Sequence, residues 1–235
     1  MGLTEHTVSL LASWGASAIL PAVVTAVIAY FCGCFNGAVI VSKYILRDDV
    51  RNHGSGNAGL TNFYRTFGGP LTVVVILTDV LKAIVAILVS VWLGGLFDPR
   101  ILPTTPLENQ AMILVFFKYW GGLFCLLGHM FPCMFHFKGG KGILSGGTIA
   151  IMIDWRIALV VWGGFLILAV LTRYVSLGSC WAGASFPFIT WFVYRSVPVT
   201  VLAVIIGGLI LYMHRGNIHR LLTGTENKFT LHKKS

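Results

Sequence analysis

A polar loop in the first third of the chain could bind an anion. Residues 51–62 read RNHGSGNAGLTN, with three glycines, three asparagines, two hydroxyl side chains, a histidine and an arginine. Glycine lets backbone N–H groups approach an anion closely, and a nearby arginine can contact a phosphate with two hydrogen bonds. The alternative is a flexible connection, but the density of donors favours ligand binding. The candidate contacts are Ser55, Asn57, Thr61, Asn62 and Arg65.

A second glycine-rich segment, GHMFPCMFHFKGGKG at 128–142, sets two lysines around a pair of glycines. If a helix starts near Gly142, its free N–H groups and its dipole favour an anion there. It is not a Walker loop, because Phe135 replaces the first glycine of that motif and Gly142 replaces its serine or threonine. The alternative is a hinge whose lysines only set membrane topology. The candidate contacts are His129, Lys138, Gly139, Gly140, Lys141 and Gly142.

Two more polar pairs have the spacing of one helix face. Ser176 and Ser179 are three residues apart, and we weigh ligand contact equally against a helix cap with a small packing residue. His214 and Asn217 are also three apart, in a basic segment after the last apolar run. A basic membrane anchor would explain the arginines of that segment but not this pair.

Ionisable residues also occur inside apolar segments. Asp79 and Lys82 are at i and i+3, and we expect them to pair structurally, with a role in the site as the alternative. Lys118 either snorkels to the membrane surface or lines the site. The eight acidic residues are scattered, so we expect no metal site. No Ser-His-Asp set is visible either.

The elements that must position these residues are membrane helices. The 235 residues are 56% hydrophobic and 11% charged, against roughly 25% charged in a soluble domain. We therefore expect a single all-α domain over residues 1–235, a polytopic bundle of about seven transmembrane helices, with five or six as alternatives. The predicted spans are 18–45, 70–96, 111–131, 143–153, 157–171, 176–194 and 197–213.

The basic residues predict the orientation of this bundle. With the N-terminus outside, inner segments hold twelve Lys and Arg residues and outer loops hold three, Arg100, Arg156 and Arg195. The C-terminus is then cytoplasmic. The net charge of +9 thus reflects topology, and we expect no nucleic acid as a partner. The polar segments described above all fall on the cytoplasmic side and can meet there.

The motifs resemble those of the PlsY family, bacterial acyl-phosphate:glycerol-3-phosphate acyltransferases of the cell membrane. The resemblance rests on GSGNAGLTNFYR, GHMFPCMFHFKGGKG, TRYVSLGS and HRGNIHRLLTGTENK, in order from about residue 30 to 229. Two segments depart from the family pattern. Gly33-Cys34-Phe35-Asn36 replaces Gly-Ser-Ile-Pro, and Ile143-Leu144-Ser145 replaces Val-Ala-Thr.

The resemblance implies the first acylation step of bacterial phospholipid synthesis, without a cofactor. The sn-1 hydroxyl of glycerol 3-phosphate attacks the carbonyl of a fatty acyl phosphate, and lysophosphatidic acid and phosphate leave. Ser55, Arg65, His214 and Asn217 match positions expected to hold glycerol 3-phosphate. Lys138–Gly142 matches the loop for the acyl phosphate, and Lys141 is the first candidate to reach both substrates.

Two questions stay open at this point. The base is either a phosphoryl oxygen of the substrate, which we favour, or a histidine, His129 or His214. No histidine is followed by an aspartate five residues later, the pattern of other glycerol-phosphate acyltransferases. The alternative function is a membrane transporter of phosphate or phospho-esters, which would place polar breaks near the membrane midplane.

Overall fold

The computed structural model describes residues 16–97 and 106–229, and all regular elements in these ranges are helices. This confirms the all-α prediction. In chain order they are α2 (Ala16–Cys34), α3 (Gly37–Ile40), the π-helix η1 (Val41–Ile45), the 3-10 helix η2 (Val50–Asn52), α4 (Leu60–Thr66), α5 (Leu71–Phe97), α6 (Leu107–Met130), the 3-10 helix η3 (Cys133–Phe135), α7 (Ile143–Ile153), α8 (Trp155–Thr172), α9 (Val175–Tyr194), α10 (Val197–Met213) and α11 (Arg215–Leu222).

Four segments are long and apolar enough to cross a membrane: Ile19–Ile45, Leu71–Leu96, Leu107–Phe135 and Trp155–Thr172. A fifth results if α10 and α11, which are bent by 60° at their junction, count as one span. The number of spans predicted from the sequence, seven, stays a prediction. So does the location of the N-terminus outside, because the first fifteen residues lie outside the described ranges.

The first apolar segment is not one continuous helix. It breaks between Cys34 and Gly37, where Asn36 starts a new helix by accepting a hydrogen bond from the backbone N–H of Val39 at 3.1 Å. The amide of Asn36 also donates to the carbonyl of Ala58 at 3.0 Å. The break therefore ties the end of α2 to the polar loop 51–62.

The fourth and fifth apolar segments form a helical hairpin. Asp154 ends α7 and caps α8 by accepting from the backbone N–H of Arg156 at 2.8 Å. The indole of Trp162 donates to the carbonyl of Gly147 at 3.1 Å, across the hairpin. With 11 residues, α7 is about 17 Å long, well short of the ~30 Å hydrocarbon core. It starts at one end of the bundle and stops inside it.

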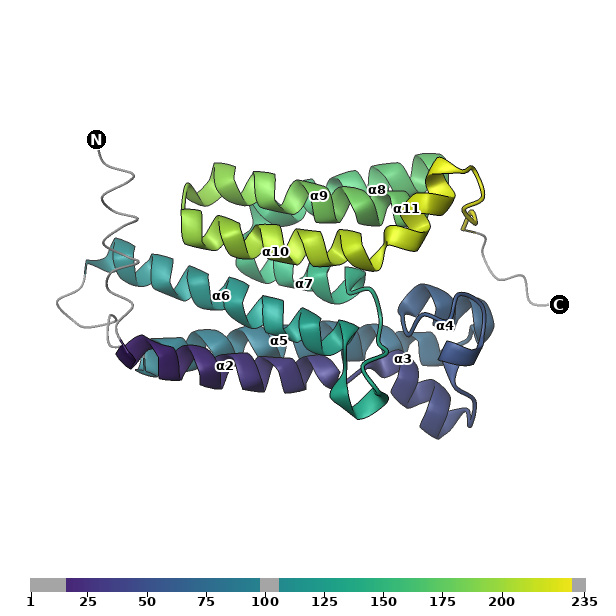
Figure 1. The fold of residues 1–235 in the computed structure, drawn as a ribbon, viewed down its shortest axis with the longest axis horizontal. Coiled ribbons are helices and arrows are strands. Elements are labelled where there is room, and N and C mark those ends of the chain that lie inside the picture. The colour runs from purple at the N-terminus through teal and green to yellow at the C-terminus, as the bar shows by residue number, and fades with distance from the viewer. Residues whose placement is uncertain (1–15, 98–105, 230–235) are drawn as a thin grey trace.

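The helices pack into two groups joined by α7 (Figure 1). One group holds α2, α5 and α6, the other holds α8, α9 and α10, and α7 packs on both α5 and α8. One buried apolar cluster draws residues from both groups. Its polar link joins the hydroxyls of Tyr119 and Thr190 at 2.8 Å, between α6 and α9. Two smaller apolar clusters, one around Val50 and Phe63 and one around Ala58 and Phe135, lie under the loops at one end of the bundle.

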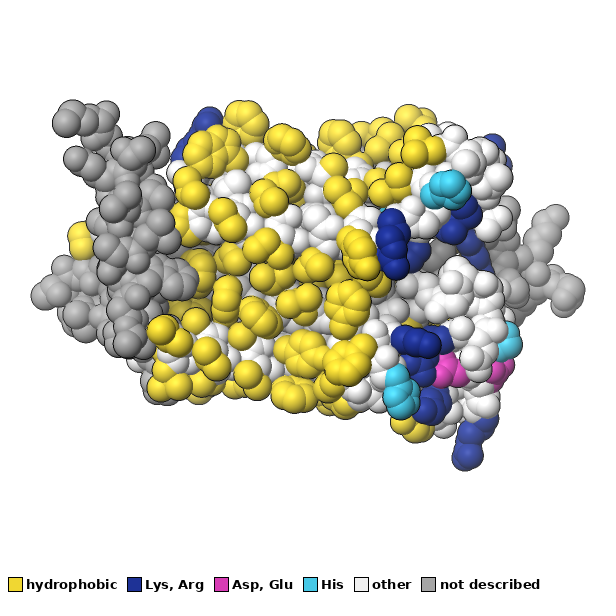
Figure 2. Space-filling view, viewed as in Figure 1, with side chains coloured by type: hydrophobic (Ala, Val, Ile, Leu, Met, Phe, Trp, Pro, Cys, Tyr) yellow, Lys and Arg dark blue, Asp and Glu magenta, His cyan; other side chains and the backbone are white. Residues whose placement is uncertain are grey.

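The outer surface of the bundle is apolar. Large hydrophobic side chains on every long helix are exposed, including Leu20, Val170 and Phe188. On the face in Figure 2, hydrophobic side chains cover much of the described surface, while the histidine and most of the charged side chains gather at one end. Exposed apolar bands of this kind suit contact with lipid.

Candidate functional site

The polar segments far apart in the sequence meet at one end of the bundle (Figure 1). This polar end comprises the loop 46–59 with α4, the loop 131–142, α11 and the segment 223–229. The start of α2 and the turn between α9 and α10 lie at the opposite end. The segments that carry the candidate residues therefore share one side of the molecule.

The loop 51–62 is shaped from inside by Asn62. Its amide donates to the carbonyls of Val50, His53 and Asn57 at 3.0 to 3.1 Å, and its oxygen accepts from the backbone N–H of Ser55 at 3.1 Å. We expected Asn62 to contact the substrate, but it is buried and all of these bonds are internal to the loop. Asn62 acts as the scaffold of the loop.

The other residues of this loop remain available to a ligand. Ser55 and Arg65 are exposed, and Asn57 and Thr61 are half-buried. Within the described ranges, no side-chain hydrogen bond involves any of these four. Gly54 has a φ of 55°, and a Cβ there would lie 2.3 Å from the oxygen of Asn62. This conformation of the loop requires glycine at position 54.

The backbone N–H groups of two candidate contacts in the loop 131–142, Gly139 and Gly140, have partners within the protein. In the structure these groups donate to the carbonyls of Met130 and His129, both at 3.1 Å. The two glycines instead permit close packing, because a Cβ at Gly139 would lie 2.0 Å from the carbonyl oxygen of His129.

The start of α7 is where backbone N–H groups remain free. Gly142 precedes the helix with a φ of 78°. The first intrahelical hydrogen bond runs from the N–H of Gly146 to the carbonyl of Gly142 at 2.7 Å. The N–H groups of the first turn therefore have no helical partner, and the helix dipole favours an anion beside them. Lys141 is adjacent, and Lys138 is exposed nearby.

Arg51 joins the two loops. Its guanidinium donates to the carbonyls of Phe135 at 2.8 Å and Lys138 at 3.3 Å, and it pairs with Asp49 at 2.7 Å. Arg51 opened the sequence motif but was not a candidate site residue. The sequence does not distinguish Arg51 from the neighbouring basic residues, because the carbonyls that it contacts belong to residues far away in the chain.

On the other side of the site, one carboxylate organises the candidates from α9 and α11. Glu226 accepts hydrogen bonds from Ser176 at 2.9 Å, Asn217 at 2.8 Å and Arg220 at 2.7 Å. Lys141 donates to the oxygen of Asn217 and so joins this network to the glycine loop. Sequence reasoning missed Glu226. The available signal was that it is the only acidic residue after position 213.

The charges in this network perturb one another. Burial lowers the pKa of Lys141, and the neighbouring Arg220 lowers it further. Burial raises the pKa of Glu226, but hydrogen bonds from Asn217, Ser176 and Arg220 outweigh burial, and the pKa falls below its usual value. Glu226 therefore stays ionised among these donors.

The side chains of His214 and Ser179 differ in how available they are to bind a ligand. His214 is buried at the junction of α10 and α11, and its Nδ1 lies 2.8 Å from the carbonyl of Ile210. Burial lowers its pKa to about 4, so the ring is neutral at pH 7, and Nε2 can accept a proton if Nδ1–H donates to that carbonyl. The hydroxyl of Ser179 donates to the carbonyl of Val175 at 2.9 Å in its own helix. This bond favours the packing alternative for Ser179.

The segment 223–229 connects the two sides of the polar end. The ring of Phe229 stacks on Tyr64 of α4 with centroids 6.2 Å apart. Its backbone N–H donates to the carbonyl of Arg173 at 2.8 Å, at the turn between α8 and α9. The helix that carries Arg65 is thereby held near the segment that carries Glu226.

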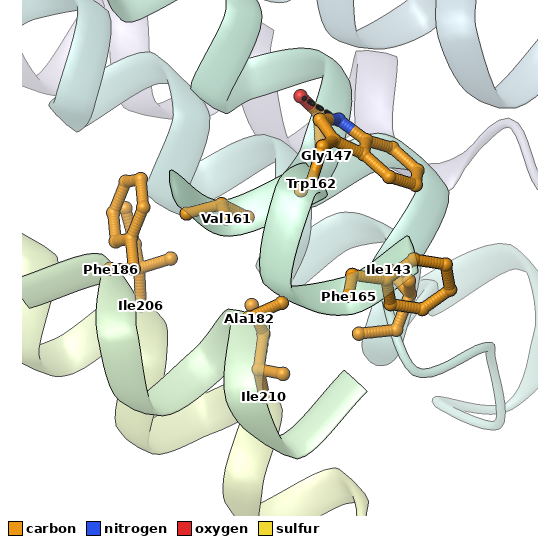
Figure 3. Close-up of a pocket in the computed structure, with 10 residues that line it drawn as sticks. Ile143, Gly147, Val161, Trp162, Phe165, Ala182, Phe186, Ile206 and Ile210 are labelled. Atoms are coloured by element: carbon orange, nitrogen blue, oxygen red, sulfur yellow. Dashed lines mark hydrogen bonds between the residues drawn. The ribbon is translucent and has the colours of Figure 1, made fainter. Parts of the chain in front are cut away.

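A small apolar pocket lies next to the start of α7 (Figure 3). It is formed by α7, α8, α9 and α10, and Trp162 and Phe165 extend over it from α8. Ile143, which follows Gly142 directly, is one of its lining residues. The lining of the pocket thus begins one residue beyond Gly142, the last residue of the loop 131–142.

Comparison with known proteins gives one consistent family. Residues 23–224 match a family model described as Glycerol-3-phosphate acyltransferase. A relative of that name from Thermoanaerobacter pseudethanolicus is 36% identical over 88% of this chain and 95% of its own length. Glycerol-3-phosphate acyltransferase 2 from Bacillus anthracis is 32% identical over 88% of this chain and 98% of its own.

Two solved structures are also similar. Both are of PlsY (YgiH), an integral membrane glycerol 3-phosphate acyltransferase, one in its glycerol 3-phosphate form and one in its lysophosphatidic acid form. They superpose with TM-scores of 0.74 and 0.72 at 33% and 32% identity. Each match covers 89% of this chain and 96% of the solved one.

Proposed function

Because the chain belongs to the glycerol-3-phosphate acyltransferase family, we propose that it acylates the sn-1 hydroxyl of glycerol 3-phosphate from a fatty acyl phosphate. The products are lysophosphatidic acid and inorganic phosphate. The observation that carries the proposal is the junction of the loops 51–62 and 131–142 at one end of an apolar bundle. A water-soluble phosphate ester and a membrane-bound acyl donor can meet only at such a boundary.

The polar residues at this end of the bundle offer two neighbouring anion sites. Ser55, Arg65, His214 and Asn217 would hold glycerol 3-phosphate, and the planar guanidinium suits its phosphate. The lysine pair and the first turn of α7 would hold the phosphoryl group of the donor. Lys141, which already contacts Asn217, stands between the two and offsets their mutual repulsion.

The chemistry needs no enzyme-bound intermediate. An acyl phosphate is a mixed anhydride, so the hydroxyl of glycerol 3-phosphate can attack its carbonyl carbon directly. The C–O bond to phosphate then breaks and inorganic phosphate leaves. The enzyme supplies orientation and positive charge for the developing oxyanion and the leaving phosphate. The hydroxyl proton passes to a phosphoryl oxygen of the substrate, with the neutral His214 as the alternative acceptor.

The same proposal places the enzyme in a bacterial cell membrane with the polar end in the cytoplasm. The basic residues at this end, against Arg156 and Arg195 at the other, agree with the preference of positive charge for the inner side. The acyl chain would lie against the apolar surface next to Ile143. Its partners are therefore the two substrates and the surrounding lipid.

The deciding experiment is acyl transfer by the purified protein in detergent or lipid, with labelled glycerol 3-phosphate and either acyl phosphate or acyl-CoA as donor. We expect lysophosphatidic acid from acyl phosphate alone. Lys141→Ala and Arg65→Ala should each lower kcat/KM by about 100-fold or more, as expected for a lost charge-assisted contact in a reacting site.

The matched control is Arg156→Ala, which removes an exposed arginine at the opposite end of the bundle and should leave activity unchanged. Wild-type turnover with acyl-CoA but not acyl phosphate would overturn the donor assignment. Full activity of Lys141→Ala together with Arg65→Ala would overturn the site.

A further inference from the structure

A cluster of three ionisable side chains lies beneath the junction of the two loops, and of the three only His129 has so far been considered for the reaction. Asp79 and Lys82 come from α5 and His129 comes from the last turn of α6. All three are buried, with at most 6% of each residue exposed. Charged groups at such depth are costly unless each has a partner, so their contacts show what the cluster can do.

The ammonium of Lys82 uses its three hydrogens on three partners. It lies 2.6 Å from a carboxylate oxygen of Asp79, 3.1 Å from the carbonyl of Phe35 and 2.7 Å from Nδ1 of His129. The carbonyl of Phe35 is available because the helix breaks at that point. Asp79 balances the charge of the ammonium directly.

Two charged groups face Nδ1 of His129, the Lys82 ammonium at 2.7 Å and, beyond hydrogen-bond distance at 3.6 Å, the Asp79 carboxylate. An ammonium can only donate, so Nδ1 of the ring must accept, and a neutral imidazole whose Nδ1 accepts carries its proton on Nε2. The proton on Nε2 is therefore a property that the ion pair imposes on the ring. The ring can therefore donate a hydrogen bond from Nε2.

The Nε2 edge of the ring faces the glycine loop. A Cβ added at Gly140 would lie 2.3 Å from Nε2 of His129 and 2.7 Å from the carbonyl oxygen of Ala58. Nε2 thus lies where the loops 51–62 and 131–142 meet. Within the described ranges, no hydrogen bond occupies Nε2. The backbone of Gly140 packs closely on this edge of the ring, and a larger residue at position 140 would displace it.

We propose that Asp79 and Lys82 are positioning residues that hold His129 as a neutral Nε2–H donor to an oxygen of the acyl phosphate. This inference rests on the proposed function. It also removes His129 as the general base, because a nitrogen that already carries its proton cannot take the proton of the attacking hydroxyl. The hydroxyl proton then has two acceptors left, a phosphoryl oxygen of the substrate or His214.

The first test compares two replacements of His129. In His129→Gln the side-chain amide keeps an N–H near the position of Nε2 but has no basic nitrogen, and in His129→Leu both are lost. We expect His129→Leu to lower kcat/KM for acyl phosphate about 10- to 100-fold, the range of a hydrogen bond to a charged group. His129→Gln should recover most of that loss. Equal loss in both variants would mean that the ring is needed as a base and would overturn the proposal.

The second test separates positioning from simple charge balance. Lys82→Met leaves Asp79 buried without a partner and could fail to fold for that reason alone. The double variant Asp79→Asn with Lys82→Met removes both charges, a change that is often neutral for stability. We expect the double variant to fold. Its KM for acyl phosphate should be about tenfold higher than that of the wild type, and its KM for glycerol 3-phosphate should be unchanged. Wild-type kinetics in the double variant would show a purely structural ion pair.

A control and a direct readout complete the design. Ser90→Ala removes another buried polar group of α5, about two turns further along, and should not change either KM.

The nitrogen shifts of 15N-labelled histidine, with His129→Gln to assign the signal, should show the Nε2–H tautomer in the wild type and its loss in the double variant. A proton on Nδ1 in the wild type would overturn the inference even if the enzyme is active, whereas an inactive wild type would count against the proposed function alone.

Discussion

At the scale of single residues, the site depends on a carboxylate that has no direct role in the chemistry. Glu226 accepts from Ser176, Asn217 and Arg220, and Asn217 in turn contacts Lys141. A negative group amid residues expected to bind an anion is consistent with a positioning role. It holds the donors of α9 and α11 in place and makes no hydrogen bond to Lys141 within the described residues.

The first residue-scale prediction follows from these bonds. Glu226→Ala leaves three donors without their acceptor, and each lost bond to a charged group is worth about 1.5–3 kcal/mol. We expect a lower unfolding temperature and a higher KM for glycerol 3-phosphate, with a milder effect for Glu226→Gln, whose oxygen still accepts. Glu108→Ala, an exposed acid at the start of α6, is the control. Unchanged thermal unfolding and KM in Glu226→Ala would contradict this role.

A second prediction concerns His214 and pH. Its pKa of about 4 in the folded protein lies below its ordinary 6.5, so the unfolded chain binds the proton more tightly. The stabilising contribution is therefore complete above pH 6.5 and is lost as the pH falls towards 4. Between pH 7.5 and 5, the unfolding temperature should fall more in the wild type than in His214→Gln.

His219→Gln removes an exposed histidine from α11 and should behave like the wild type over this range. Parallel pH curves for the wild type and His214→Gln would show that the ring is not held neutral by burial.

At the scale of elements, α8 holds α7, whose first residue follows the loop 131–142 directly, in a helical hairpin. The indole of Trp162 packs over Gly147 and donates to its carbonyl, which fixes the spacing of the two helices. Glycine is unfavourable within a helix, so its presence in α7 needs a packing reason. The close approach of the indole supplies that reason.

Two alanine substitutions in this hairpin should have opposite effects. In Gly147→Ala the new Cβ would lie 2.2 Å from the indole of Trp162, and we expect overpacking to destabilise the protein by about 1–3 kcal/mol. In Gly163→Ala the Cβ meets nothing within 4 Å, and the change should be neutral or stabilising by up to about 1 kcal/mol. Thermal unfolding in detergent measures both, and an equal effect of the two would show that the indole can move aside freely.

At the scale of the whole molecule, the distribution of side chains is strongly asymmetric. On the face in Figure 2 apolar side chains cover much of the bundle, and most of the charged side chains gather at the end that carries the candidate site. Within the described residues the two helix groups are connected there by the segment 223–229, through Phe229. The orientation of the whole molecule therefore decides which compartment supplies glycerol 3-phosphate.

A native thiol can test this orientation. Cys133 is exposed at the polar end, whereas Cys34 and Cys125 are buried. A charged maleimide that does not cross membranes should label the protein in inside-out vesicles but not in intact spheroplasts. Cys133→Ser should remove that labelling. Labelling of Cys133 in intact spheroplasts would place the polar end outside the cell.

The sequence by itself determined the helical segments and the polar motifs. Hydropathy is summed over neighbouring residues, so α5, α7 and α10 are visible as apolar runs whatever they pack against. The spacing of Gly142 after two lysines likewise indicated a helix start near an anion site, and α7 begins there. These features are local, and local sequence is sufficient to specify them.

The tertiary structure decided which polar groups remain free for a ligand. Gly139 and Gly140 are candidate contacts by sequence, and carbonyls at the end of α6 accept the hydrogen bonds of their N–H groups. Asn62 is likewise occupied inside its own loop, and Glu226 gains partners from α9 and α11. A hydrogen-bonding group is available only when no other group occupies it, and that depends on segments brought close by packing.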